Sequence, residues 1–359
     1  MVRVLHIVGK MDCGGQENFI MNLYRNIDKE KVQFDFVVHS KDEGFFDSEI
    51  EKLGGKIYRI TPMTENLLKH IKELKKVLIE NNYNIVHRHT DSSIIFVDLL
   101  ISKRCGVKYR IAHSHNTVSS KLKILSILFR PLLNKYANFK FACGEAAGKW
   151  LFGNCSNNVY VIKNGIQVKD FLFSEKIRNK MRTELEIQDK FVVGNIARFN
   201  KQKNHLFLLD IFNCVAKKKK NAILLLVGDG EEKDIIFKRA NELGIINKII
   251  FLGIRKDVCD ILQAIDVFVF PSLYEGLPVS LIEAQASGVK MFISDTITKE
   301  VNVTNSIEYL SINDYAEKWA DAICSSNYTR NSNISGIKEN GYDAIDSAKR
   351  LEKMYLDMK

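Results

Sequence analysis

Two glutamates placed eight positions apart are the residues of this sequence best suited to bind a substrate. Glu275 follows an apolar run that ends at Phe270, and Glu283 lies within the stretch Val-Ser-Leu-Ile-Glu-Ala. Because carboxylate oxygens accept hydrogen bonds from hydroxyl groups, Glu275 can hold the hydroxyls of a sugar and Glu283 those of a ribose. The alternative is that one is an ordinary loop residue and the other a solvated helix residue.

The residues between these glutamates predict a binding site for an anion. Gly276 lacks a side chain, so a ligand can approach the backbone there. Pro278 suits the first turn of a helix, and the free N–H groups around Leu277 to Ser280 would lie at the N-terminus of that helix. A helix N-terminus attracts negative charge, so we expect a diphosphate beside the two glutamates.

Two cations, Arg198 and Lys203, follow another apolar run in the same half of the chain. Positive charge at this place can neutralise a diphosphate and stabilise the charge that grows as the diphosphate leaves. The chain has 53 Lys and Arg residues. The alternative is therefore that these two are ordinary surface cations.

The sequence Ala-His-Ser-His-Asn ends a predicted strand and places His113 and His115 on one face of it. Two histidines can bind a metal ion, but the spacing reveals no third ligand, so we expect no metal site. The other interpretation is a core histidine with an exposed partner.

Gly14 and Gly15 follow the first predicted strand and precede a helix expected to begin at Gln16. The arrangement is similar to a phosphate-binding loop, although neither the full G-x-G-x-x-G pattern nor a Walker lysine motif is present. A tight strand–helix turn without a ligand is the alternative.

Short apolar runs alternate with amphipathic stretches from one end of the chain to the other. Near-continuous runs such as Ala-Ile-Leu-Leu-Leu-Val are typical of parallel strands buried on both faces. The alternation indicates right-handed βαβ units in open sheets. The predicted strands occupy residues 2–8, 32–39, 56–60, 84–89, 109–115, 139–143, 159–163, 191–197, 222–227, 248–252, 267–270 and 290–294.

The series of strands is interrupted once, after the turn dipeptide Asn164-Gly165. We therefore predict two doubly wound α/β lobes, residues 1–165 and 166–340, and an amphipathic helix within 341–359 that packs back toward the first lobe. Ligands of open α/β sheets bind beyond the carboxyl ends of the strands. The active site is accordingly expected in a cleft between the lobes.

The segment with the two glutamates resembles the Glu-x7-Glu signature of the retaining glycosyltransferases of family 4, which have the two-lobed GT-B fold. Other segments match that family in order over most of the chain, and the resemblance is greatest to bacterial enzymes that build capsular, exopolysaccharide or O-antigen chains. The matching segments are Gly14-Gly15, Asn164-Gly165, Gly194-Asn195-Ile196-Ala197-Arg198, Lys203-Asn204-His205, Val227-Gly228-Asp229-Gly230 and Phe251-Leu252-Gly253.

The resemblance implies roles for particular residues. In the family, one histidine at the end of the strand that carries the doublet lies near the transferred sugar. His115 fits that place because it is further along the strand, and His113 remains a second candidate for it. Asn164, at the crossover between the lobes, is a further possible site residue. The implied catalytic residues are His115, Arg198, Lys203 and Glu275. The implied donor-binding residues are Gly14, Gly15, Gly228, Gly253, Gly276, Leu277, Pro278, Val279 and Glu283.

The implied reaction moves a sugar from a nucleotide-sugar donor to a glycan or polyprenyl-linked acceptor, with retained anomeric configuration. UDP is the expected nucleotide because it is common among the resembled enzymes. No Asp-x-Asp motif occurs in the sequence, and we expect no metal ion or other cofactor. The alternatives are a non-hydrolysing nucleotide-sugar 2-epimerase and an inert nucleotide-sugar-binding partner subunit.

The net charge of +10 is concentrated in the first lobe, where residues 1–165 carry 25 Lys and Arg against 16 Asp and Glu. Residues 99–144 hold nine basic residues and no acidic one. Residues 119–140 mix cations with bulky apolar side chains, which predicts an amphipathic face for an anionic membrane. The alternative is a packed helix with a basic edge, and Pro131 argues against one straight helix. Nucleic acid is not expected as a partner, because no recognition motif accompanies the charge.

The remaining sequence features predict a cytoplasmic protein, with peripheral attachment to the inner face of the cell membrane through residues 99–144. The seven cysteines are scattered without the spacing of a zinc or redox site. No apolar run reaches the length of about 20 residues that spans a bilayer, and no signal peptide is recognisable.

Overall fold

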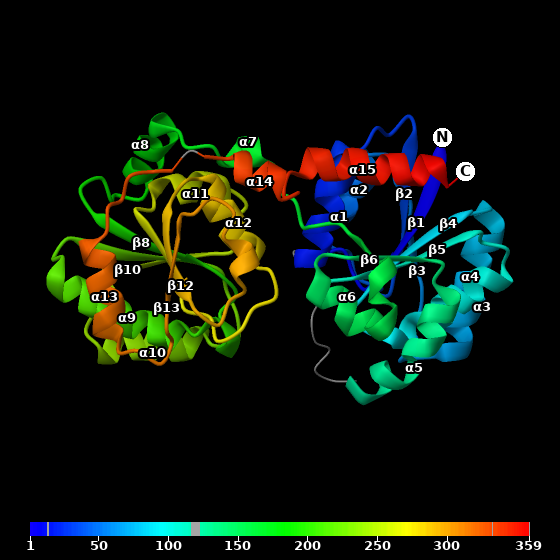
Figure 1. Ribbon diagram of the computed structural model, residues 1–359, viewed down its shortest axis with the longest axis horizontal. Helices are drawn as coiled ribbons and strands as arrows, with labels where there is room; N and C mark the ends of the chain where they lie inside the picture. The colour runs from blue at the N-terminus through cyan, green and yellow to red at the C-terminus, as the bar shows by residue number, and fades with distance from the viewer. Residues whose placement is uncertain (13, 116–122, 332, 359) are drawn as a thin grey trace. The chain divides into compact units, whose positions relative to one another are not determined.

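The computed structural model describes residues 1–12, 14–115, 123–331 and 333–358. The chain divides into two compact units, of which the first comprises residues 1–165 with 341–359 and the second comprises residues 166–340. Each unit is built on a parallel sheet with helices on both of its faces (Figure 1). The predicted fold class of two doubly wound α/β units is therefore confirmed.

The first unit contains a seven-stranded sheet. Its strands are β1 (Val2–Val8), β2 (Val32–Val38), β3 (Ile57–Arg59), β4 (Ile85–Thr90), β5 (Tyr109–Ser114), β6 (Phe139–Ala142) and β7 (Tyr160–Val161). They are arranged in the order β3-β2-β1-β4-β5-β6-β7, and every pair is parallel. The order reverses between β1 and β4, which is the topological switch point where ligands of such sheets bind.

Seven helices flank this sheet in the described part of the unit. They are α1 (Gly15–Asn26), α2 (Asp47–Lys52), α3 (Leu67–Asn81), α4 (Phe96–Arg104), α5 (Lys123–Tyr136), α6 (Glu145–Phe152) and α15 (Ala344–Asp357). Although α15 ends the chain, it packs against α1, β1 and β2 (Figure 1). Tyr355 of α15 is fully buried, and Glu352 accepts a hydrogen bond from the backbone N–H of Asp28 at 2.8 Å.

Both faces of this sheet are buried because successive strand residues point to opposite sides. Val4 and Val8 of β1 belong to the core on one face, and Leu5 and Ile7 belong to the core on the other. His6 lies between Val4 and Val8 on the first of these faces, although it is polar. This exception bears on the histidines described below.

The second unit contains a six-stranded parallel sheet in the order β10-β9-β8-β11-β12-β13. Its strands are β8 (Phe191–Ile196), β9 (Ala222–Val227), β10 (Ile249–Gly253), β11 (Val267–Phe270), β12 (Lys290–Ser294) and β13 (Ile307–Leu310). Its helices are α7 (Val168–Phe171), α8 (Glu175–Glu184), α9 (His205–Lys218), α10 (Lys233–Glu242), α11 (Val258–Ala264), α12 (Val279–Ala286), α13 (Ala316–Ser325) and α14 (Ser335–Glu339). The sequence prediction missed β13, a four-residue edge strand whose Ile-Glu-Tyr-Leu sequence is too short for a clear pattern.

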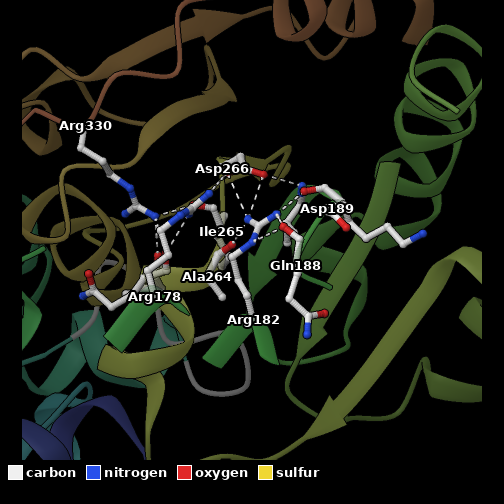
Figure 2. Close-up of polar contacts among 12 residues, drawn as sticks. Arg178, Arg182, Gln188, Asp189, Ala264, Ile265, Asp266 and Arg330 are labelled. Atoms are coloured by element: carbon white, nitrogen blue, oxygen red, sulfur yellow. Dashed lines mark hydrogen bonds and ion pairs between the residues drawn. The ribbon is translucent and has the colours of Figure 1, made fainter. Parts of the chain in front are cut away.

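Three arginines fix the start of β11, the strand that leads to Glu275. Arg178 and Arg182 of α8 bond to Asp266, and Arg182 and Arg330 also donate to carbonyl groups at the C-terminal end of α11 (Figure 2). Asp266 in turn accepts the backbone N–H of Val192 at 2.8 Å. Cations stabilise a helix C-terminus. This cluster therefore holds α11, β8 and β11 together at the amino ends of the two strands. The predicted site lies at their carboxyl ends.

Pro131 does not end the helix in which it lies. α5 continues from Lys123 to Tyr136 with Pro131 inside it. Pro131 is exposed on this helix, and a proline at such a position removes one backbone hydrogen bond of the helix. Lys121 and the rest of residues 116–122 lie outside the described residues. Among the described helices, none combines the length and hydropathy needed to cross a membrane.

Candidate active site

An ion pair joins two predicted catalytic residues in the second unit. The Nζ atom of Lys203 lies 2.6 Å from Oε1 of Glu275 and 4.9 Å from the centre of the Phe270 ring. The Lys203 side chain is 16% exposed and that of Glu275 is 6% exposed. The pair therefore sits at the carboxyl ends of β8 and β11 with its charges largely removed from water, where electrostatic attraction is strong.

Short polar loops hold this ion pair in place. Asn200 accepts a hydrogen bond from the Lys203 backbone N–H, which begins the turn after β8. Gln202 donates to Oε2 of Glu275 at 3.1 Å and to the carbonyl of Tyr274 at 2.8 Å. Asn204, with φ of +56°, caps α9 and donates to the Pro271 carbonyl. These bonds tie the loop after β8 to the loop after β11. Gln202 was not among the site residues predicted from the sequence.

The predicted helix N-terminus lies directly after the Glu275 loop. α12 begins at Val279, with Pro278 immediately before it, while Gly276 is exposed and Leu277 is half-buried. The first N–H groups of a helix have no partner within that helix, so this end can bind an anion. Glu283 lies one turn further along α12, partly exposed, and desolvation raises the pKa of its carboxyl to about 7. The carboxyl therefore titrates near neutral pH.

Arg198 does not lie in the same cluster as Lys203. Its side chain is 70% exposed and pairs with Glu231 at 3.1 Å, so the guanidinium is held on the surface beyond the end of β8. A surface ion pair of this kind contributes little to stability. The structure therefore separates the two predicted cations, with Lys203 buried against Glu275 and Arg198 free to change partners.

Gly228 and Gly253 lie where two neighbouring strands end. The backbone N–H of Gly228 donates to the carbonyl of Gly253 at 2.8 Å. Gly228 has a φ of +138°, and a Cβ atom there would lie 2.0 Å from the carbonyl oxygen of Ala197. Only glycine fits this close approach of β8 and β9. The two glycines thus shape the strand ends next to Arg198.

Gly14 and Gly15 lie at the N-terminus of α1 in the first unit, as predicted from the sequence. A Cβ atom on Gly14 would lie 2.1 Å from an Oε2 atom of Glu17, so this carboxylate occupies the space beside the glycine. Burial raises the pKa of Glu17. An acidic side chain already lies at this helix N-terminus, in the space where a phosphate could approach Gly14.

The two histidines of the doublet have different environments. His113 is fully buried, and its Nδ1 lies 3.0 Å from Nε2 of His87. His115 follows the end of β5 and is half-buried, with Nε2 at 2.8 Å from Nδ1 of His89. Phe19 of α1 contacts both rings. His115 is therefore the histidine at the carboxyl edge of the sheet, and His113 belongs to the interior.

Asn164 lies just before the junction between the two units. Its side-chain oxygen is buried and has no hydrogen-bond partner among the described residues. The neighbouring Gly165 packs against Ala344, where a Cβ atom would lie 2.8 Å from the Ala344 nitrogen, and its carbonyl accepts a bond from Asn22. The glycine of this dipeptide is thus required by close packing against the start of α15.

Three histidines that our sequence analysis did not single out surround the doublet. His6 of β1 and His87 and His89 of β4 lie beside His113 and His115 on one face of the sheet. The repeated His-x-His pattern in two predicted strands was the available signal. It was overlooked because the pairing of those strands is not visible in the sequence.

Known families match both parts of the chain. The family described as "Glycosyltransferase Family 4" matches residues 13–170, and the family described as "Glycosyl transferases group 1" matches residues 177–325. Together the two matches cover most of each unit and include all the predicted site residues.

Individual proteins agree with these family matches. EpsF of Bacillus subtilis (strain 168), provisionally named a glycosyltransferase, is 35% identical, and the alignment covers 98% of this chain and 96% of EpsF. A UDP-Gal:alpha-D-GlcNAc-diphosphoundecaprenol alpha-1,3-galactosyltransferase of Escherichia coli is 24% identical, over 81% of this chain and 80% of that protein. The crystal structure of Anabaena Alr3699/HepE in complex with UDP and glucose superposes with a TM-score of 0.80, at 18% identity, and 99% of each chain is covered.

Proposed function

The chain belongs to the glycosyltransferases, with a family 4 first half and a group 1 second half, and on that premise we propose that it transfers a sugar from a UDP-sugar to a lipid-linked glycan with retained anomeric configuration. The expected role is the synthesis of a surface polysaccharide. The named donor and acceptor of the Escherichia coli relative, and the UDP bound to the Anabaena protein, support this choice of substrates.

The observation that carries the proposal is the buried pair of Lys203 and Glu275 next to the N-terminus of α12. A diphosphate at that N-terminus would lie beside the Lys203 ammonium. The hydroxyls of the attached sugar would then compete with Lys203 for the Glu275 carboxylate, and Glu283 would accept hydrogen bonds from the ribose. Donor binding thus gives Lys203 a new negatively charged partner, while Glu275 keeps hydrogen bonds from the sugar hydroxyls and from Gln202.

We assign the chemical step to the donor itself together with these residues. The bond between the sugar C1 and the diphosphate oxygen breaks, and the acceptor oxygen forms its bond to C1 on the same face. The acceptor proton passes to the departing diphosphate, whose growing charge Lys203 and the α12 N–H groups stabilise. Arg198 can leave Glu231 and add a second positive charge, because its present partner is exposed.

A transfer assay tests this function. Purified protein would be incubated with a panel of nucleotide sugars, with and without a polyprenyl-diphosphate-linked acceptor, and donor consumption and product configuration would be measured by NMR. We expect consumption of a UDP-sugar that requires the acceptor, and a product with the anomeric configuration of the donor. Isomerisation of the donor without acceptor would identify an epimerase, and binding without conversion would identify an inert partner subunit.

An exposed apolar row on α5 supports docking of the first unit to an anionic membrane. Ile124 is 82% exposed and Leu128 is 65% exposed, while Ser126 and Leu133 face the interior. Lys123 and Lys135 lie on the same helix and are exposed. An interfacial helix combines an apolar face with cations in this way. A lipid-linked acceptor would be presented at the surface that this helix enters.

Vesicle binding separates this docking from ordinary surface charge. We expect the protein to sediment with phosphatidylglycerol vesicles and not with phosphatidylcholine vesicles, and salt should release it because each cation contributes only ~1 kcal/mol. Combined replacement of Lys123, Ile124 and Leu128 by Ser should abolish binding. Arg130 is left intact because it donates to the Trp150 carbonyl and supports the fold.

The matched control for this experiment removes exposed apolar side chains from the second unit, at Ile235 and Ile254. This control variant should bind vesicles like the wild type. Wild-type protein that stays in the supernatant at low salt would reject membrane docking, and a soluble acceptor would then be the better choice.

A further inference from the structure

Five of the eight histidines of the chain form a stacked cluster inside the first unit. We call this cluster the histidine ladder. Neighbouring rings lie 4.2–5.3 Å apart between centroids. All lie on the sheet face that α1 and α15 cover, where Phe19 and Tyr355 contact them. The members of the histidine ladder are His6, His87, His89, His113 and His115.

The register of the sheet creates this cluster. His6 is paired with His87 between β1 and β4, and His89 is paired with His113 between β4 and β5. Because side chains two positions apart share a face, His87 and His89 lie together, and His115 extends the row beyond β5. Aliphatic side chains would normally fill this face of a buried parallel sheet.

Hydrogen bonds between the rings use most, but not all, of the nitrogens. One row runs from His6 Nδ1 to His89 Nε2 at 2.9 Å, and from His89 Nδ1 to His115 Nε2 at 2.8 Å. The other runs from Tyr355 through His87 to His113. Within the described part of the chain, the buried atoms His6 Nε2, His113 Nε2 and His115 Nδ1 have no partner. Buried polar atoms are rarely left in this state.

We propose that His89, His113 and His115 bind one divalent transition-metal ion. One ligand nitrogen from each ring lies within 4.8 Å of the other two, so small side-chain movements bring all three into contact with one ion. Three imidazoles with an open fourth position form a known type of zinc centre, and imidazole also suits copper and nickel. The sequence offered only the His113–His115 pair, and β4 supplies the third ligand.

Two other groups of side chains fit a metal less well. His6, His87 and His89 also come within 4.8 Å of one another, but all three are buried and His87 is held by Tyr355. In the group of His39, His70 and Asp98, the carboxylate already pairs with Arg88 and His70. The proposed group includes half-buried His115 just after the strand end, so it lies nearer to solvent than the group of His6, His87 and His89.

The protonation state of the rings is compatible with metal binding. Burial lowers the pKa of the imidazoles of His89, His113 and His115, so the rings are neutral near pH 7. A neutral imidazole is the form that binds metals. The ion would replace the hydrogen bond between His89 and His115 and would leave the Lys203–Glu275 pair of the second unit untouched.

Direct metal titration of the full chain tests this site. Metal-free protein would be titrated with Co²⁺, followed by its visible d–d absorption, and with Zn²⁺ in competition with a chromophoric chelator. We expect one equivalent of each ion to bind. Because changes beside a metal site already weaken binding ten- to a hundredfold, His89→Gln and His115→Gln should each weaken it by at least about a hundredfold.

His6→Gln is the matched control, because it removes a ladder histidine bonded to His89 and keeps the three proposed ligands. Because His6 is a hydrogen-bond partner of a ligand and not itself a ligand, this variant should still bind one equivalent of Co²⁺ and lose clearly less affinity than His89→Gln or His115→Gln. His115→Gln, at the strand end, keeps the test valid if a core variant fails to fold. Loss of binding in His6→Gln with retention in His115→Gln would overturn the assignment. Absence of binding, or a cobalt–thiolate charge-transfer band that places the ion on cysteines, would also overturn it.

Discussion

Lys203 and Glu275 neutralise one another across 2.6 Å at the carboxyl ends of two adjacent strands of the second unit. From the sequence, these residues are expected to have separate partners, the donor diphosphate for Lys203 and the donor sugar for Glu275. In the structure each is the other's partner, and Gln202 holds the second oxygen of the carboxylate. The site is therefore already arranged in a charge-balanced form, and the proposed donor would replace the partners of both residues.

The first prediction concerns this ion pair. Lys203→Met and Glu275→Gln should each destabilise the second unit by up to ~3 kcal/mol, because one charge loses its partner while Lys203 keeps some contact with solvent. The double variant should lose less than the sum of the two. Urea denaturation of the four proteins measures this coupling, and strict additivity would show that the pair contributes nothing.

The same variants should differ in function. Glu275→Gln should lower turnover far more than affinity for free UDP, because the proposed partner of Glu275 is the sugar. Removal of one stabilising group from an active site typically costs ~10²–10³ in turnover. Calorimetry with UDP and with the UDP-sugar provides the comparison. Equal losses of affinity for the two ligands would contradict this division of roles.

The second prediction follows from Glu283, whose carboxyl has a pKa of about 7. Only the ionised form can accept two ribose hydroxyl bonds, so UDP affinity should rise as the pH rises through 7, by up to about tenfold per pH unit below it. The folding stability of the protein without UDP depends on pH in the opposite direction. A raised carboxyl pKa contributes stability below about 4.5, and this contribution is lost as the pH rises through 7.

Glu283→Gln tests this pH dependence directly. UDP has a titration of its own, which wild type and variant share, so the difference between them isolates Glu283. The variant should bind UDP ten- to a hundredfold more weakly at pH 8, since a charged hydrogen-bond partner is worth ~1.5–3 kcal/mol. The pH dependence of UDP affinity that remains in this variant should reflect the titration of UDP alone. An unchanged wild-type pH profile in the variant would remove Glu283 from the site.

The third prediction is that transfer survives an excess of EDTA. We assign the stabilisation of the leaving diphosphate to Lys203, Arg198 and the α12 N–H groups, which replace a divalent ion on the donor. The ion proposed for the histidine ladder has no part in this step. Activity that disappears with EDTA and returns with manganese or magnesium would show that the donor requires a metal.

The fourth prediction concerns Gly228, whose φ of +138° and close approach to Ala197 exclude a side chain. Gly228→Ala should destabilise the second unit by more than ~3 kcal/mol, because strained backbone alone costs ~1–3 kcal/mol and the methyl group overlaps a carbonyl. Gly244→Ala is the control, since Gly244 has a φ of +66° and open space around it. It should cost only about 1 kcal/mol. If urea denaturation shows the same loss of unfolding free energy in both variants, the close packing at Gly228 is unimportant.

The sequence by itself determined the strands and the class of the fold. Apolar runs such as Ala222–Val227 and Val267–Phe270 were predicted with the bounds that the structure has. Their hydrophobicity is local and continuous, and strands buried on both faces require it. The edge strand Ile307–Leu310 was missed because its four residues carry no comparable signal.

The sequence also determined which residues follow strands, and hence most of the proposed donor site. Only the tertiary structure decided which of them meet. Lys203 and Glu275 are 72 positions apart, and the parallel pairing of β8 with β11 brings them to the same sheet edge. Arg198, predicted as its equal, points to Glu231 instead. In the first unit, strand register turned scattered histidines into one ladder, because pairing between strands is a non-local property that no window of sequence contains.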